Sequence, residues 1–109
     1  MWEAKYKSNY ITEEKQKQIQ AFFDYFLANH AIIEQKIVAR DKSFVKEFEQ
    51  ELSQVVGKNG LRFNFFYLEG YFEVVLYYGR DDYLLTIFTE IAEKKRNYKL
   101  QNWRFVLQK

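Results

Sequence analysis

The side chains that could carry out chemistry in this sequence are few. The single histidine, His30, is followed four residues later by Glu34, and an acidic pair stands at Asp81 and Asp82. A histidine oriented by a carboxylate can act as a general acid or base, and paired carboxylates can bind a metal ion or share a proton. Residues spaced by four share one face of a helix, so His30 and Glu34 could meet. These two groups are the candidate catalytic residues.

Both groups also have structural interpretations, which we favour. The chain has no cysteine and no second histidine, so a metal site at His30 lacks its usual partner ligands. Asp81 and Asp82 follow Gly79 and precede an apolar helical pattern, where Asp commonly caps a helix. Phosphate-binding, zinc-protease, serine-hydrolase and calcium-loop motifs do not occur in the sequence. We therefore predict no catalytic residues, no metal site, no cofactor and no enzymatic activity.

Length and composition favour one domain over residues 1–109. A chain of 109 residues is close to the commonest domain size, and 48% hydrophobic with 29% charged residues is the balance of a soluble globular protein. The sequence has no apolar run long enough for a signal peptide or a membrane span, and the lack of cysteine fits a reducing compartment. We expect a cytoplasmic protein with no membrane partner.

The N-terminal half of the chain predicts one strand and one or two helices. Residues 1–7 alternate between apolar and charged, as in a half-buried strand. Thr12 to about Asn29 has the caps and spacing of an amphipathic helix. Its apolar stripe is Ile19, Phe22, Phe23, Phe26 and Leu27. Helical spacing recurs over Ala31 to Val56, and the sequence leaves open whether a break near Arg40 divides this stretch into two helices.

The C-terminal half predicts a hairpin, a helix and a final strand. Two aromatic runs flank Glu69-Gly70 and form the hairpin, a helix follows Asp81 or Asp82, and alternation after Asn102 gives the last strand. The whole order matches ferredoxin-like α+β domains, in which the terminal strands would be neighbours in an antiparallel sheet with helices on one face. Without the strand at residues 1–7, an open three-stranded variant of this α+β fold remains.

The predicted hairpin has two unlike faces. With a two-residue turn, alternation gives one wholly apolar face that should pack on the helices: Leu61, Phe63, Phe65, Tyr67, Phe72, Val74, Leu76 and Tyr78. The other face mixes aromatic, aliphatic and charged side chains, as protein interfaces do. We predict that it binds a protein partner or a second copy of the chain, through Arg62, Phe66, Tyr71, Glu73, Tyr77 and Arg104. A loop or the N-terminus covering this face is the alternative.

Nucleic-acid binding is a second hypothesis, and a small-ligand or enzyme site that no motif reveals is a third. The densest basic cluster is Lys94, Lys95, Arg96 and Lys99, but cations are also common at a helix C-terminus. The formal net charge is only +2, whereas nucleic-acid binding uses several clustered cations. The order of elements is similar to the RNA-recognition motif, which stacks bases on aromatic rings, yet Glu73 occupies a position where that motif carries a ring. A carboxylate there disfavours RNA.

One further likeness concerns the first helix and the last strand. The stretch "FFDYFLANH", the apolar aromatic hairpin and the closing "WRF" resemble small uncharacterised bacterial α+β proteins, some of them immunity-type. The matching residues are Phe22, Phe23, Phe26, Asn29, Trp103 and Phe105. The resemblance implies a bacterial, non-catalytic protein, and an immunity protein that inhibits a toxin is one form of it. It assigns no functional residue.

Overall fold

The computed structural model describes residues 10–58 and 60–109. In chain order these form α2 (Glu13–Val38), η1 (Lys42–Phe44), α3 (Val45–Val56), β1 (Arg62–Leu68), β2 (Tyr71–Tyr77), α4 (Asp82–Lys94), η2 (Lys95–Asn97) and β3 (Trp103–Gln108), where η marks a short 3₁₀ helix. The predicted α+β class is confirmed. The predicted strand over residues 1–7 lies outside the described residues.

The described strands form one mixed sheet in the order β1-β2-β3. β1 and β2 pair antiparallel, with Leu68 opposite Tyr71 and Arg62 opposite Tyr77, which is the predicted register. β2 and β3 pair parallel, whereas the sequence analysis expected an antiparallel sheet. The difference arises because α4 carries the chain back along the sheet before β3 begins, as a parallel crossover requires. The described part of the sheet has three strands in a mixed arrangement.

The hairpin turn explains why its register could be predicted. Glu69 and Gly70 both have positive φ, 36° and 94°, which defines a type I′ turn. Such a turn matches the right-handed twist of the two strands and needs no further residues to close the hairpin. It therefore fixes which side chains of β1 and β2 share a face.

The first helix is longer than predicted, and the break that the sequence left open is real. α2 continues without interruption past Asn29 to Val38, because no Gly or Pro interrupts the helix, and the Asn29 side-chain amide donates to the Tyr25 carbonyl. The chain turns at Arg40, which has a φ of 59°. Its neighbour Asp41 then caps η1 by accepting a hydrogen bond from the Ser43 amide.

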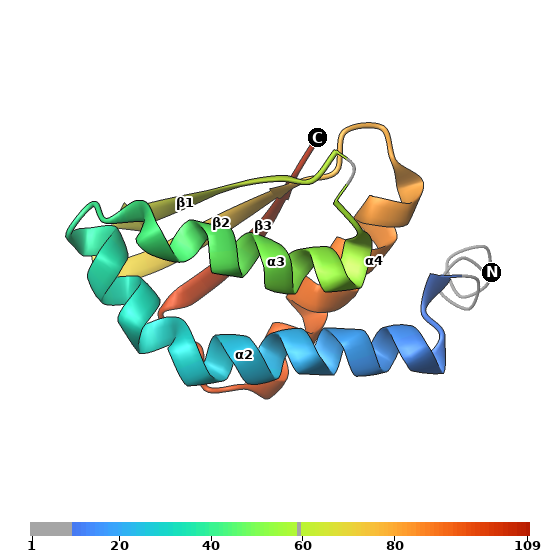
Figure 1. The fold of residues 1–109 in the computed structure, drawn as a ribbon, viewed down its shortest axis with the longest axis horizontal. Coiled ribbons are helices and arrows are strands. Elements are labelled where there is room, and N and C mark those ends of the chain that lie inside the picture. The colour runs from blue at the N-terminus through green and yellow to red at the C-terminus, as the bar shows by residue number, and fades with distance from the viewer. Residues whose placement is uncertain (1–9, 59) are drawn as a thin grey trace.

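The core lies on one face of the sheet, where α2, α3 and α4 pack (Figure 1). Trp103 is fully buried, stacks on Phe72 at 5.3 Å between ring centroids and meets Phe26 edge to face at 4.8 Å. Two residues that were predicted to lie on apolar, core-facing surfaces are exposed at the margins of this core, so these two predictions are wrong. Leu27 is 37% exposed and Tyr67 is 50% exposed.

Among residues 10–58 and 60–109, no helix has both the length and the apolar character that a membrane span requires.

Candidate protein-binding surfaces

The face of the sheet that lies opposite the helices is called the open face here. Its side chains form a grid in which β2 is the central strand. In one row Phe66, Glu73 and Arg104 are neighbours, and the rows around it contain Leu68 and Tyr71 on one side and Asn64, Val75, Val106, Arg62, Tyr77 and Gln108 on the other. The predicted interface residues Arg62, Phe66, Tyr71, Glu73, Tyr77 and Arg104 are therefore brought together.

Two arginines on the open face lie over tyrosine rings. The Arg104 guanidinium carbon is 4.0 Å from the centroid of the Tyr71 ring, and that of Arg62 is 5.5 Å from the Tyr77 ring. Such cation–π contacts are worth about 0.5–1 kcal/mol at exposed sites. The Asn64 amide also donates to the Tyr77 hydroxyl at 3.3 Å. These contacts hold the polar side chains in place before any partner binds.

The stacked arginines change which aromatic residues are free to act as anchors. Tyr71 and Tyr77 are half-buried, and Val75, in the middle of the central strand, is 3% exposed. The free apolar area lies instead at the end of β1, where Phe66 is 43% and Leu68 is 41% exposed. Leu68 was not among the predicted interface residues, because exposure depends on which neighbours cover a residue.

His30 and Glu34 do meet, as their spacing predicted. His30 Nδ1 and Glu34 Oε2 are 2.7 Å apart. The same Glu34 oxygen accepts a hydrogen bond of 2.7 Å from the indole N–H of the buried Trp103. The carboxylate therefore satisfies a buried donor that would otherwise have no partner, which is a structural task. None of the pockets described below includes either His30 or Glu34.

The two residues of the acidic pair have different surroundings. Asp81 caps α4, because its carboxylate accepts hydrogen bonds from the amides of Tyr83 at 2.9 Å and Leu84 at 3.2 Å. Asp82 borders a hollow of about 310 Å³ at the start of α4, together with Arg80. Within the described part of the chain, no three His, Asp or Glu side chains are grouped as a metal ion would require. The predicted capping role is confirmed for Asp81.

The basic cluster at the end of α4 is partly committed to the fold. The Lys95 ammonium donates to the Trp103 carbonyl at 2.8 Å, so it links η2 to the start of β3. Arg96 and Lys99 are exposed, and Lys94 is half-buried. Lys95 is therefore occupied by a contact within the fold, so fewer of the four predicted cations are available to bind nucleic acid.

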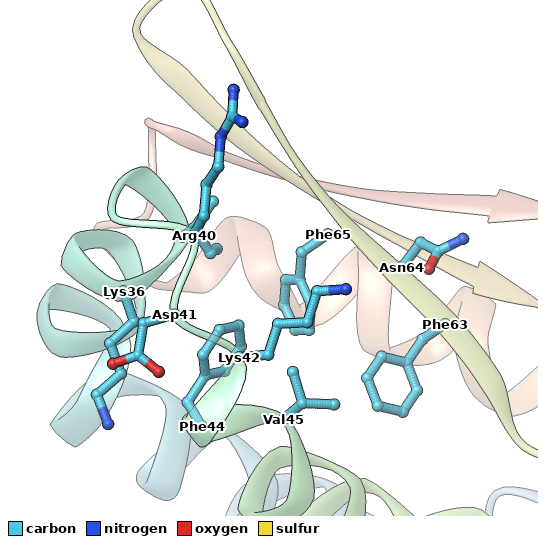
Figure 2. Close-up of a pocket in the computed structure, with 10 residues that line it drawn as sticks. Lys36, Arg40, Asp41, Lys42, Phe44, Val45, Phe63, Asn64 and Phe65 are labelled. Carbon is cyan, nitrogen blue, oxygen red and sulfur yellow. The ribbon is translucent and has the colours of Figure 1, made fainter.

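A second surface, which the sequence analysis missed, lies along the outer edge of β1. A pocket of about 450 Å³ is bounded by β1 and by the turn from α2 to α3 (Figure 2). Its apolar part consists of Ile37, Phe44, Val45, Phe63 and Phe65, and its polar rim of Lys36, Arg40, Asp41, Lys42 and Asn64. An adjoining hollow of about 510 Å³ shares Val45, Phe63 and Asn64 and adds Glu49, Leu61, Arg62 and Tyr77. These two hollows together are called the β1 groove.

The rim of the β1 groove is positively charged. Three cations and one carboxylate give 3 − 1 = +2 at the pocket of about 450 Å³. The adjoining hollow adds Arg62 and Glu49, so the whole groove has 4 − 2 = +2. A hydrogen bond from the Ser43 amide, with further help from the Ser43 side chain and from Lys36, holds the pKa of Asp41 below its ordinary value. Figure 2 shows Asp41 pointing away from β1 and Lys42 extending toward it. The side of the pocket next to the strand is therefore cationic.

No protein family, curated protein or solved structure matches this chain.

Proposed function

We propose that this protein is a non-catalytic binding module that buries the open face of its sheet against another protein. One observation supports the proposal most directly: Phe66 and Leu68 remain 43% and 41% exposed, and Leu68 is paired with Tyr71, whose ring already carries the Arg104 guanidinium at 4.0 Å. Large exposed apolar side chains with a neighbouring Arg and Tyr are typical of the centre of a protein interface. The face is also rigid, because it belongs to a paired sheet.

The charged residues of the open face would set specificity. Glu73 and Arg104 lie opposite each other on neighbouring strands, so the face presents both signs of charge around its apolar residues. A partner with complementary charges would be preferred over one with matching charges. A toxin inhibited by a bacterial, cytoplasmic immunity protein is one such partner, and a second copy of this chain is another.

The first test concerns partner capture. Tagged full-length protein is used to capture partners from its native cells, and the bound protein is identified and its affinity measured. A central anchor contributes about 2 kcal/mol or more, so Phe66→Ala should weaken binding about 30-fold, and Phe66→Ala with Leu68→Ala should abolish it. The control is Ile32→Ala, which removes an apolar side chain that is 52% exposed on α2.

Light scattering of the pure protein tests the self-association version. A dimer that dissociates in the Phe66→Ala variant and persists in the Ile32→Ala variant supports the open face as the interface. Equal capture and equal mass for both variants would contradict the proposal.

A further inference from the structure

The outer edge of β1 carries unpaired backbone groups. Leu68 and Tyr71 close a two-residue type I′ turn and so form the hydrogen-bonded pair next to it, after which hydrogen-bonded and non-hydrogen-bonded pairs alternate. Phe63, Phe65 and Tyr67 fall on the non-hydrogen-bonded positions. Their N–H and C=O groups therefore point away from β2. No other described strand pairs with that side of β1, because β1 ends the sheet.

Within the described residues, the sequence of β1 has few of the features that protect an edge strand from pairing with another chain. Edge strands are commonly protected by Lys, Pro, inward-pointing charges or bulges. β1 has the sequence RFNFFYL, with a single charge at its first residue, and pairs with β2 continuously over all seven residues. An edge of this kind is suited to receive an additional strand.

The groove beside this edge has the shape that an added strand requires. A strand that pairs with Phe63, Phe65 and Tyr67 would place every second side chain on the same side of the sheet as these residues. Those side chains would enter the β1 groove, over Val45 and Phe44. The seven residues of β1 span about 24 Å at 3.4 Å per residue, so a segment of about six to eight residues fits.

The charges of the groove identify the kind of segment. Lys42 extends toward β1 (Figure 2), and Arg40 joins it on the rim of the pocket. A second copy of β1 would pair about Phe65, the middle of the strand, and would bring the two cationic rims together across the twofold axis. The resulting repulsion disfavours self-pairing. An incoming strand with a carboxylate near Lys42 would instead be attracted.

Arg40 gives independent support for a role of this rim. Its φ of 59° is at the end of α2, where the left-handed conformation usually selects Gly. Bulky residues in that conformation are strained and are concentrated at functional sites. The residue at this position is an arginine, and it lines the pocket.

We infer that the β1 groove binds an extended acidic segment of a partner protein by strand addition to β1. Alternate apolar side chains of the segment fill the groove, and a carboxylate of the segment pairs with Lys42 and Arg40. The inference goes beyond the proposed function, and it rests on that function only in requiring a protein as the partner. The surface is the edge of the sheet, not its open face.

The test begins with selection from a displayed library of random octapeptides on the full-length protein. The expected sequences alternate apolar and polar residues and are rich in Asp or Glu. A fluorescein-labelled copy of a selected peptide should bind the wild type, and Lys42→Glu should weaken it at least about 10-fold. The control is Lys46→Glu, an exposed charge reversal on α3 that does not border the groove. No selected peptides, or equal binding by both variants, would overturn the inference.

The backbone pairing has its own test. Tyr67→Pro removes an outward N–H and leaves the pairing with β2 intact, because edge strands tolerate Pro where the N–H faces outward. It should abolish peptide binding, whereas Tyr67→Ala should preserve most of it. If Tyr67→Pro fails to fold, amide exchange of the wild type decides: the N–H groups of Phe63 and Phe65 should exchange more slowly with peptide bound, and unchanged exchange would overturn strand addition.

The two proposals can fail separately. Phe66→Ala changes the open face and should leave peptide binding unchanged, while Lys42→Glu should leave any self-association through the open face unchanged. Loss of peptide binding in Phe66→Ala, with Lys42→Glu unaffected, would move the peptide to the open face and overturn the groove.

Discussion

At the scale of single residues, the groups that could do chemistry are held by the fold. Asp81 caps a helix, and Glu34 accepts hydrogen bonds from both His30 and Trp103. The first two of these relations could be predicted, because they join residues two or four apart, where local geometry decides. The bond to Trp103 spans 69 positions and depends on tertiary packing, so no local pattern indicated it.

The Glu34 carboxylate gives a prediction about stability. Glu34→Ala leaves the buried indole N–H of Trp103 without an acceptor, which should lower the free energy of unfolding by about 1–3 kcal/mol. Glu34→Gln keeps an acceptor oxygen and should cost less. Urea unfolding followed by tryptophan fluorescence measures both. His30→Ala is the control, since it retains the bond to Trp103; a loss as large as that of Glu34→Ala would assign the role to the His30 pair.

At the scale of elements, local signals succeeded where a turn or a cap decides the outcome. The type I′ turn at Glu69 and Gly70 fixed the hairpin register, and Thr12 caps α2 as expected. The sequence did not decide where α2 ends, because the residue with left-handed backbone conformation at its end is Arg40. A Gly at that position would have indicated the end of the helix. The parallel placement of β3 could not be predicted, since strand order depends on packing between distant segments.

The same helix end predicts a stabilising substitution. Arg40→Gly removes the steric cost of a φ of 59°, and although Gly loses more chain entropy on folding, the left-handed position should give a net gain of about 0.5–1 kcal/mol. Ala39→Gly is the matched control, because Ala39 has an ordinary φ of −78° and should lose about 0.5–1 kcal/mol. Chemical denaturation of both variants checks the opposite signs. A loss for Arg40→Gly would show that its side chain stabilises the fold.

The candidate surfaces also divide at this scale. The open face was predicted from alternation within the hairpin, because a two-residue period on paired strands determines which side chains are neighbours. The β1 groove was not, because Lys42 and Val45 border Phe63 only after the turn at Arg40 folds α3 back beside β1 (Figure 1), where Phe48 meets Phe63. In the sequence, Arg40 and Lys42 simply precede a helix, and this pattern does not indicate that they will lie beside β1.

At the scale of the whole molecule, a single hydrophobic core rich in aromatic rings joins α2, α3 and α4 to the sheet. Tyr25 belongs to α2, and its side chain lies near carboxylates of α3. Burial, followed by the charges of Glu47 and Glu51, raises the pKa of Tyr25 to about 12 from 10.0. Because a small single domain unfolds as one unit, ionisation at this one position should change the stability of the entire fold.

The sign of that change follows from proton binding. Between pH 10 and 12 the unfolded chain releases the Tyr25 proton while the folded chain retains it, so stability falls as pH rises. One pKa unit corresponds to about 1.4 kcal/mol, and partial exposure of the ring reduces the effect to the order of 1 kcal/mol. Tyr25→Phe should therefore lose less stability than the wild type over this range, in urea unfolding measured at each pH. Glu47→Gln should make the loss of stability over this pH range smaller than in the wild type, because it removes one of the carboxylates that raise the pKa of Tyr25. Parallel curves for the wild type and Tyr25→Phe would show that the hydroxyl ionises freely in the folded protein.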